Sequence, residues 1–335
     1  MKILKFKNTT RTVIFITGLI VFLVLVSLLI LSLIQQKPPL KARIAYVPFS
    51  SCLPFFVALE NGYFEKRGID VEPIKTGNAN EAINSLIAGK VEGTIGLGLT
   101  TLFSVEQATA GQFKIYLPSV ETKTKYVTFL LVPKDSPITS IAELKGKRIG
   151  TYSGTSQLLV LKLFLQRFMN PDKDVQIIQV SPELQAQALM AGQFDALFTI
   201  DPYATIVIEK GFTKVLMENP RVEHILNPFP AGANAFSLKF INENPAAVEK
   251  IVAALEEAID FIRKNEKDAK KVLPKYTPLE DAISQKSHLY EWWKMNEVDE
   301  DVIQKYADLL FEGKELKKRI EVSTLFLRAR GSKLR

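Results

Sequence analysis

Cysteine and histidine are scarce in this chain of 335 residues, which has one cysteine and two histidines. A single cysteine, Cys52, excludes an intramolecular disulfide and therefore the small secreted scaffolds that disulfides stabilise. His224 and His288 have no cysteine or histidine at the spacing of metal ligands. We therefore expect neither a metal site nor a cofactor.

Acidic residues are absent from the first 37 positions. This stretch holds five of the 43 Lys and Arg residues, so the remaining 38 basic side chains nearly balance the 36 acidic ones. The formal charge of +7 thus reflects a basic terminus rather than a basic face, and we expect no nucleic-acid partner. With 47% hydrophobic and 24% charged residues, the chain has the composition of a globular protein with an adequate core.

Residues 12–34 form an uncharged run of 23 residues, long enough to cross a hydrocarbon core of roughly 30 Å as a helix. The run ends without an Ala-x-Ala cleavage pattern, and Cys52 lies too far downstream to be a lipidated cleavage cysteine. We expect an uncleaved signal anchor in the cell membrane, with residues 1–11 in the cytoplasm. After a short linker at residues 35–41, the balance of positive charges favours a globular part outside the cell.

One stretch of sequence occurs twice in the globular part. The matching segments are 43–44 with 148–149, 70–71 with 174–175, and 86–92 with 189–195. Each copy alternates short apolar or β-branched runs with stretches of helical period, which predicts two α/β lobes. Because ligands of open α/β sheets collect at the carboxyl ends of the strands, two such lobes indicate a binding cleft between them.

Small hydroxyl residues and glycines follow the strands at these ends. Residues 153–156, Ser-Gly-Thr-Ser, match residues 48–51 of the first copy, so the two loops would face each other. Residues 153–156 would also begin a helix, whose amino terminus suits a carboxylate, sulfonate or phosphate. Ordinary capping by Ser153 or Thr155 is the alternative.

Two further positions, Asp201 and Tyr203, each leave two roles open, and two others, Asn80 and Trp292, concern local structure. Asp201 either accepts hydrogen bonds from a ligand or caps the helix that follows. Tyr203 either contacts a ligand or packs in the core. Asn80 is expected to cap the helix that runs to Ala88, and Trp292 is expected to lie in a helix of the first lobe.

Four segments of the chain together resemble a known family. They are residues 62–72 (Gly-Tyr-Phe-Glu-Lys-Arg-Gly-Ile-Asp-Val-Glu), 86–92, 141–150 and 240–245. In these segments the chain is similar to the extracytoplasmic substrate-binding proteins of ABC importers of the nitrate, sulfonate and taurine type, which include pyrimidine-precursor binders. The resemblance covers nearly everything from Lys41 to about Leu327.

This resemblance implies a two-lobed α/β fold of the type II periplasmic-binding class, with each lobe a central β-sheet flanked by helices. The uncharged run at residues 12–34 adds one expected transmembrane helix before it. Lobe 1 would be discontinuous, with residues 42–126 and 230–335, and lobe 2 would be residues 127–229. A monomeric ectodomain would close on a small solute and deliver it to an ABC permease and its ATPase, without catalysis.

The resemblance also carries ligand-binding loops onto this chain. The residues so assigned are Ser51, Cys52, Phe55, Thr100, Thr101, Glu121, Ser153, Gly154, Thr155, Ser156, Asp201 and Tyr203. These loops contain no Arg or Lys except Lys123 and Lys125. A neutral or aromatic ligand such as a pyrimidine is therefore expected to fit as well as a nitrate, sulfonate or taurine.

Two other classes of function stay open. A biosynthetic enzyme of this fold, such as a thiamine-pyrimidine synthase, would use Cys52 as a nucleophile, although no histidine lies near it in sequence. A sensory ectodomain would need a signalling partner, because only a few residues precede the expected anchor.

Overall fold

The computed structural model describes residues 15–27 and 40–328. Residues 15–27 are helical, and the remainder of the expected anchor at 12–34 lies outside the described residues, as do residues 1–11 and most of the linker. Within the described ranges, no helix is both long enough and apolar enough to cross a membrane. Residues from Lys41 onward form one compact unit, to which the following description refers.

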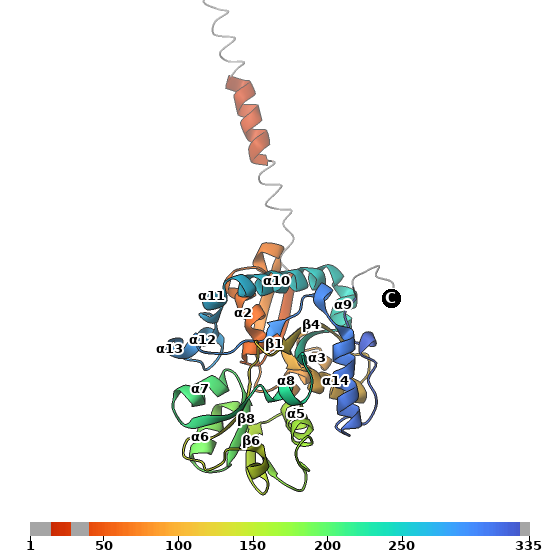
Figure 1. The fold of residues 1–335 in the computed structure, drawn as a ribbon. Helices are drawn as coiled ribbons and strands as arrows, with labels where there is room; N and C mark the ends of the chain where they lie inside the picture. The colour runs from red at the N-terminus through yellow and green to blue at the C-terminus, as the bar shows by residue number, and fades with distance from the viewer. Residues whose placement is uncertain (1–14, 28–39, 329–335) are drawn as a thin grey trace, which may run out of the picture. The chain divides into compact units, whose positions relative to one another are not determined.

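A six-stranded mixed sheet forms the centre of lobe 1 (Figure 1). Its strands, in spatial order, are β11 (Glu291–Trp292), β4 (Phe113–Glu121), β10 (Phe229–Ser237), β3 (Gly93–Gly98), β1 (Leu40–Tyr46) and β2 (Ile69–Lys75). Strands β1 and β3 run parallel, whereas β10 is antiparallel to both β3 and β4. Lobe 1 is thus built from the two ends of the globular part.

A five-stranded sheet forms the centre of lobe 2. Its strands, in spatial order, are β7 (Gln176–Val180), β6 (Arg148–Tyr152), β8 (Ala196–Ile200), β5 (Thr128–Pro133) and β9 (Thr213–Glu218). Strand β6 runs parallel to both neighbours, and β5 is antiparallel to β8 and β9. The order β7-β6-β8-β5-β9 repeats the order β2-β1-β3-β10-β4 of lobe 1, so the predicted duplication corresponds to two equivalent sheets.

Each sheet has one ion pair at the equivalent position. Arg43 Nη2 lies 2.6 Å from a Glu92 carboxylate oxygen, and Arg148 Nη2 lies 2.8 Å from an Asp195 carboxylate oxygen. In each pair the carboxylate also accepts the backbone N–H of the arginine, at 2.7 Å and 2.8 Å. The segment before β3 is thereby joined to the middle of β1, as the segment before β8 is joined to the start of β6.

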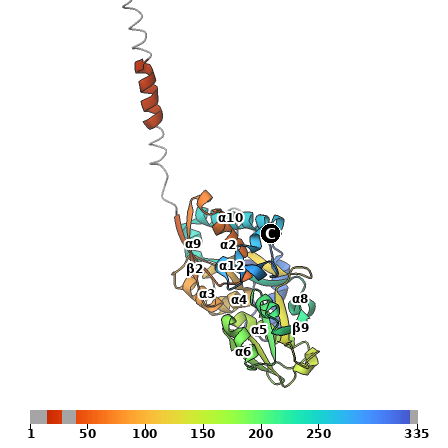
Figure 2. The same cartoon turned by 90° about the vertical axis from the view of Figure 1, so that its left-hand side faces the viewer.

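Helices cover the faces of both sheets (Figures 1 and 2). Those of lobe 1 are α2 (Leu53–Glu60), α3 (Ala79–Ile87), α4 (Leu99–Ala108), α9 (Leu238–Glu243), α10 (Pro245–Lys264), α11 (Glu266–Lys270), α12 (Leu273–Tyr276), α13 (Asp281–Ser284) and α14 (Glu300–Glu312). Those that follow the strands of lobe 2 are α5 (Thr155–Leu165), α6 (Gln185–Met190), α7 (Tyr203–Glu209) and α8 (Pro220–His224).

The longest helix of the compact unit, α10, shows how the sequence pattern determines packing. Val248, Ile251, Leu255, Ile259 and Ile262 recur at helical spacing and are buried, so they form one apolar stripe. This stripe packs against α2, whose residues are apolar almost throughout. The contact joins α2, which follows the loop after β1, to the core of lobe 1.

Two local predictions were wrong. Asn78 rather than Asn80 caps α3, because its side-chain oxygen accepts the Glu81 N–H at 2.9 Å. Trp292 lies in β11 and pairs with Ser119 of β4 instead of belonging to a helix. Its indole N–H donates to the Ser51 carbonyl oxygen at 3.1 Å, so this short edge strand supports the loop after β1.

The ion pair between Arg263 and Glu297 predicts an acid-sensitive contribution to the stability of lobe 1. Two hydrogen bonds of 2.8 Å and 2.6 Å join the guanidinium to the carboxylate. Hydrogen bonding from Arg263 lowers the pKa of Glu297 from its usual 4.5 to about 2. The pair therefore stabilises the fold fully above about pH 4.5, and this contribution is lost as the pH falls towards 2.

We expect Glu297→Gln to reduce the free energy of unfolding at pH 7 and to flatten its decline between pH 4.5 and 2. Both side chains are 36% exposed, so solvent screening should keep the effect below about 1 kcal/mol. Urea unfolding at several pH values measures it, with Glu243→Gln at an exposed position as the control. An unchanged acid slope in Glu297→Gln would contradict the assignment.

Candidate functional site

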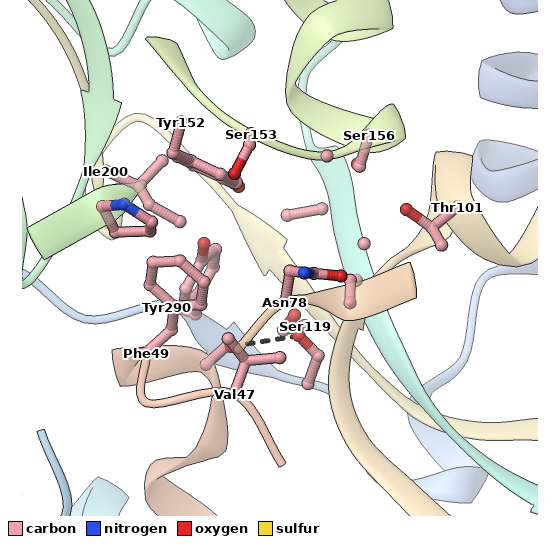
Figure 3. Close-up of a pocket in the computed structure, with 18 of the residues that line it drawn as sticks. Val47, Phe49, Asn78, Thr101, Ser119, Tyr152, Ser153, Ser156, Ile200 and Tyr290 are labelled. Carbon is pink, nitrogen blue, oxygen red and sulfur yellow. Dashed lines mark hydrogen bonds between the residues drawn. The ribbon is translucent and has the colours of Figure 1, made fainter. Parts of the chain in front are cut away.

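A cavity lies between the two lobes, at the carboxyl ends of β1, β3, β6 and β8 (Figure 3). The space open to water-sized molecules is about 40 Å³, enough for a few water molecules or a small group. Its walls are formed by Val47, Phe49, Ser51, Gly77, Asn78, Ala79, Gly96, Gly98, Thr101, Ser119, Tyr152, Ser153, Gly154, Ser156, Pro182, Ile200, Arg221, Ala231, Gly232 and Tyr290. Residues of both lobes contribute.

Five of the twelve predicted ligand-binding residues line this cavity, namely Ser51, Thr101, Ser153, Gly154 and Ser156. Figure 3 shows Ser153 and Ser156 of lobe 2 on the side of the cavity opposite Asn78 and Ser119 of lobe 1. The two loops related by the repeat therefore do meet across one space. That these residues bind a ligand stays a prediction.

Three predicted residues of lobe 1 lie behind the cavity wall instead. Cys52 is fully buried, with its thiol directed to the Val47 carbonyl oxygen at 3.2 Å. Phe55 packs in the core against Phe64, with ring centroids 5.9 Å apart. The Thr100 hydroxyl hydrogen-bonds the Tyr306 hydroxyl at 2.6 Å. The helices that follow β1 and β3 turn these side chains inward, towards the core of the lobe.

The four remaining predicted residues occupy contacts around the cavity. Asp201 is fully buried and takes the capping role, because its carboxylate accepts the Thr205 N–H at 2.8 Å. Its other carboxylate oxygen accepts the backbone N–H of His288 and lies 3.1 Å from the Nδ1 atom of that ring. Tyr203 takes the packing role, with its ring 5.6 Å from that of Phe49.

Thr155 and Glu121 connect parts of the chain across the cleft. The Thr155 hydroxyl donates to Asn80 Oδ1 at 3.4 Å, which joins α5 of lobe 2 to α3 of lobe 1. Glu121 is fully buried at the end of β4 and accepts hydrogen bonds from the backbone N–H groups of Val127 and Thr128, both at 3.1 Å. Glu121 therefore lies on the crossing between the lobes rather than on the cavity wall.

Arg221 is the main functional candidate that the sequence prediction missed. The predicted loops offered Lys123 and Lys125 as their cations, whereas the structure places the Arg221 side chain on the cavity wall. Its guanidinium donates from Nη1 to Glu121 at 2.8 Å and from Nη2 to Gln157. Burial lowers the pKa of Arg221, but the Glu121 charge raises it, and the net shift is upward. Arg221 is thus a permanent cation in a buried place.

Ser119 and Tyr290 were also missed. Ser119 lies within β4, opposite Gly232 of β10. A Cβ atom on Gly232 would lie 3.2 Å from Ser119 Oγ, so the glycine leaves room beside the hydroxyl. Tyr290 precedes β11, and burial raises the pKa of its phenol well above the usual 10. Both residues lie outside the duplicated segments, so the repeat gave no signal for them.

Three helices direct their amino termini to the cavity. Asn78 caps α3, Thr101 lies in the first turn of α4, and Ser156 lies in the first turn of α5. The caps of α4 and α5 are Gly98 and Gly154, and neither helix has a capping side chain. Free N–H groups and the helix dipoles therefore favour a negatively charged or acceptor-rich group in the cavity.

Nucleophilic chemistry has little support in this geometry. Burial raises the pKa of the Cys52 thiol to about 12, which keeps it protonated at neutral pH. The thiol is directed to the Val47 carbonyl oxygen, whereas the ring of His288 is engaged by Asp201. Cys52 is therefore not placed to attack a molecule held in the cavity.

Comparison with known proteins agrees with this architecture. Residues 50–269 match the family described as NMT1/THI5 like. A Bacillus subtilis protein named as a candidate aliphatic sulfonates-binding protein is 25% identical over 280 residues, which is 81% of this chain and 82% of that protein. A 4-amino-5-hydroxymethyl-2-methylpyrimidine phosphate synthase of Saccharomyces cerevisiae is 23% identical over 220 residues, 63% of each chain.

Among solved structures, the alkanesulfonate-binding protein SsuA of Xanthomonas axonopodis pv. citri, bound to MOPS, is similar with a TM-score of 0.72 at 21% identity. The similarity covers 88% of this chain and 100% of that one, and it establishes the two-lobed α/β fold of periplasmic binding proteins. On the match to well over half of its length, this chain belongs to the NMT1/THI5-like family.

Proposed function

We propose that this protein is the solute-binding component of an ABC import system. It would hold a small organic or oxyanion solute in the cavity between its lobes and deliver it to a permease driven by an ATPase. The observation that carries the proposal is the enclosed cavity at the facing strand ends, lined by three helix amino termini and one buried arginine. A relative named for sulfonates and a fold shared with an alkanesulfonate-binding protein support it.

The contacts around the cavity are those of a closed conformation, in which the two lobes touch each other. The Ser50 hydroxyl of lobe 1 donates to the Asp201 carbonyl oxygen of lobe 2 at 3.2 Å. Thr155 reaches Asn80 from the other lobe, and the Phe49 ring lies 5.2 Å from that of Tyr152. A solute held here would be shielded from water, and its exit requires these contacts to separate.

Membrane attachment belongs to the same proposal. The uncharged run at residues 12–34 would tether the protein, in a single pass, with its lobes on the extracytoplasmic side. Tethering would keep a loaded binding protein close to its permease, which raises the effective concentration of the two.

A pyrimidine-related role is the second candidate. Similarity to the yeast pyrimidine phosphate synthase favours it, and the rings of Phe49, Tyr152 and Tyr290 line the cavity. In this case the protein would bind a pyrimidine precursor or act as an enzyme of the same fold. The inaccessible Cys52 weighs against an enzyme that uses this thiol.

Ligand-dependent stabilisation tests the proposed function. A solute that binds only the native state raises the free energy of unfolding by RT ln(1 + [L]/Kd), about 2.7 kcal/mol at 100 times Kd. We expect one class among small sulfonates, nitrate, taurine and pyrimidines to raise the melting temperature saturably without being converted. Thermal denaturation and mass spectrometry of the recovered compound measure this. Turnover of the compound, or no stabilisation by any class, would contradict the proposal.

Gly98 provides a test of lobe closure. A Cβ atom at this position would lie 2.3 Å from Ser156 Oγ and 2.7 Å from Ser156 Cβ, across the cleft. The backbone of Gly98 has φ −59° and ψ 132°, which alanine adopts without strain. We expect Gly98→Ala to hold the lobes apart and to weaken solute binding at least about tenfold, because overpacking costs roughly 1–3 kcal/mol.

Small-angle X-ray scattering with and without solute measures the closure of this variant. The double variant Gly98→Ala/Ser156→Gly is the matched control, since it removes both atoms that the new methyl group would meet. It should regain the compact radius of gyration. Normal closure of the single variant would show that binding does not require the close approach of Gly98 to Ser156.

Cys52 provides a test of the non-enzymatic role. Because burial raises its pKa to about 12, we expect iodoacetamide at pH 8 to leave the native thiol unmodified while it alkylates the denatured chain. Cys52→Ala should keep solute affinity within about threefold, since the thiol does not line the cavity. Rapid alkylation of the native protein would place the thiol in an active centre instead.

A further inference from the structure

Residues 277–290 connect two parts of lobe 1 and contact lobe 2 between them. The segment follows α12, which packs against α2, and it leads into β11, which pairs with β4. Between these two ends, α13 packs against α7 of lobe 2 (Figure 1). The covalent crossings between the lobes run from β4 to β5 and from α8 to β10. We call residues 277–290 the strap, because they add a non-covalent connection to these crossings.

Two ion pairs of opposite direction join the strap to α7. Lys286 of the strap pairs with Glu209, the last residue of α7. The Nζ atom of the next residue, Lys210, lies 3.5 Å from a carboxylate oxygen of Glu280 in the strap. The strap thus presents a cation to one residue of lobe 2 and an anion to its neighbour. Exchanging the partners would bring like charges together, so the two pairs favour a single alignment of the strap on α7.

A third contact of the strap is buried. Asp201 directly follows β8 and is fully buried, and one of its carboxylate oxygens accepts the backbone N–H of His288. The same oxygen lies 3.1 Å from His288 Nδ1. The imidazole ring also packs on lobe 2, with its centroid 4.9 Å from that of Phe129. Because a buried carboxylate is costly without its donors, this contact should hold the strap more strongly than the two exposed ion pairs.

Asp201 connects the strap with the closed cleft. Its backbone carbonyl oxygen accepts the Ser50 hydroxyl of lobe 1, and its side chain accepts the Thr205 N–H at the start of α7. Its neighbour Ile200 lines the cavity. Movement of lobe 2 away from Ser50 would therefore carry Asp201 and α7 with it. The strap, which is fixed to lobe 1 at both ends, would resist this movement.

We propose that the strap is a latch that holds the two lobes in the closed conformation. The pairs of Lys286 with Glu209 and of Lys210 with Glu280 set its alignment, and the contact of Asp201 with His288 is its fixed point. The latch acts on the equilibrium between open and closed conformations whether or not a solute is present. Since salt screens exposed charges, ionic strength would shift this equilibrium towards the open conformation.

Distance measurement between two spin labels by pulsed electron paramagnetic resonance tests the latch in the full-length protein in detergent. The labels are attached to Lys75→Cys and Ser181→Cys, two exposed positions, in a Cys52→Ala background. Lys75 ends β2 and Ser181 follows β7, the edge strands that lie farthest in each sheet from the strands that lead into the crossings. Opening of the cleft should lengthen the distance between the labels, so the longer-distance population measures the open conformation.

Charge reversal tests the two ion pairs. Glu209→Lys/Lys210→Glu turns both attractions into repulsions without changing the net charge, and so does Glu280→Lys/Lys286→Glu. We expect each double variant to raise the ratio of open to closed molecules at least about threefold at about 0.1 M salt. The quadruple variant pairs opposite charges again and should return to the wild-type ratio. A wild-type ratio in either double variant, or no recovery in the quadruple variant, would overturn the latch.

An exposed pair within lobe 1 provides the matched control. Lys271 Nζ lies 2.8 Å from an Asp268 carboxylate oxygen, and both side chains are exposed. Asp268→Lys/Lys271→Glu should leave the ratio of open to closed molecules unchanged, because this pair does not join the lobes. An equal shift in this control would show that surface charge in general, rather than the strap, governs closure. That result would overturn the proposal.

Asp201→Asn tests the fixed point. The amide has one acceptor oxygen where the carboxylate has two, so it cannot accept from both Thr205 and His288 as Asp201 does. We expect the ratio of open to closed molecules to rise at least about tenfold and to stay raised at about 1 M salt, because the contact is buried. An unchanged ratio in a folded Asp201→Asn would overturn this role. Should the variant fail to fold, the charge reversals decide the proposal.

The wild-type protein provides a last test without any substitution in the strap. Raising the salt concentration from about 0.1 M to about 1 M shortens the Debye length from about 10 Å to about 3 Å. The open population should grow over this range. A solute-free protein that is fully open at the lower concentration would overturn the latch. No solute is needed for any of these measurements, so their failure leaves the proposed solute-binding function standing.

Discussion

The buried carboxylate of Glu121 is the interaction on which the arrangement of the lobes depends. It accepts hydrogen bonds from the backbone of Val127 and Thr128, from the Thr128 hydroxyl at 2.9 Å and from Arg221. Glu121 ends β4 of lobe 1, whereas Thr128 begins β5 and Arg221 lies in α8, both in lobe 2. Because an unpaired buried charge is strongly destabilising, by about 3–5 kcal/mol when one partner of a pair is removed, this carboxylate joins the end of a lobe 1 strand to two parts of lobe 2.

Duplication explains the framework of the site, and departures from duplication explain the differences between its two walls. The two equivalent ion pairs, Arg43 with Glu92 and Arg148 with Asp195, fix the same strands in both sheets. The loops that follow those strands then diverge. In lobe 1, the Trp292 indole donates to the Ser51 carbonyl oxygen and Cys52 is buried, whereas in lobe 2 Ser153, Gly154 and Ser156 line the cavity. The loop after β1 in lobe 1 is therefore largely buried, whereas the corresponding loop of lobe 2 leaves the amino terminus of α5 at the cavity.

The sequence predicted cavity residues where they lie in the repeat, and it missed those that lie outside the repeat. Ser51, Ser153 and Ser156 could be assigned to one space because the repeat placed them at equivalent strand ends. Arg221 could not be assigned to the cavity from the sequence, because it follows the last strand of lobe 2, outside the repeat. Its side chain is held at the cavity by hydrogen bonds to Glu121 and Gln157. Ser119 could not either, since the space beside it depends on Gly232 of a strand more than a hundred residues later. Asp201 follows β8 near the cavity, as predicted, but both of its carboxylate oxygens accept hydrogen bonds from the protein itself, from the N–H groups of Thr205 and His288.

The chain order of the sheets has a consequence for how the protein is made. All five strands of the lobe 2 sheet lie between Thr128 and Glu218, but the lobe 1 sheet waits for β10 and for β11 at Glu291–Trp292. Synthesis proceeds from the amino terminus, and domains generally fold as units during it. All strands of the lobe 2 sheet are therefore synthesised before β10, a central strand of the lobe 1 sheet. A chain that stops short of Trp292 would lack the edge strand β11 and the indole that donates to the Ser51 carbonyl oxygen, so the loop after β1 would lose this support.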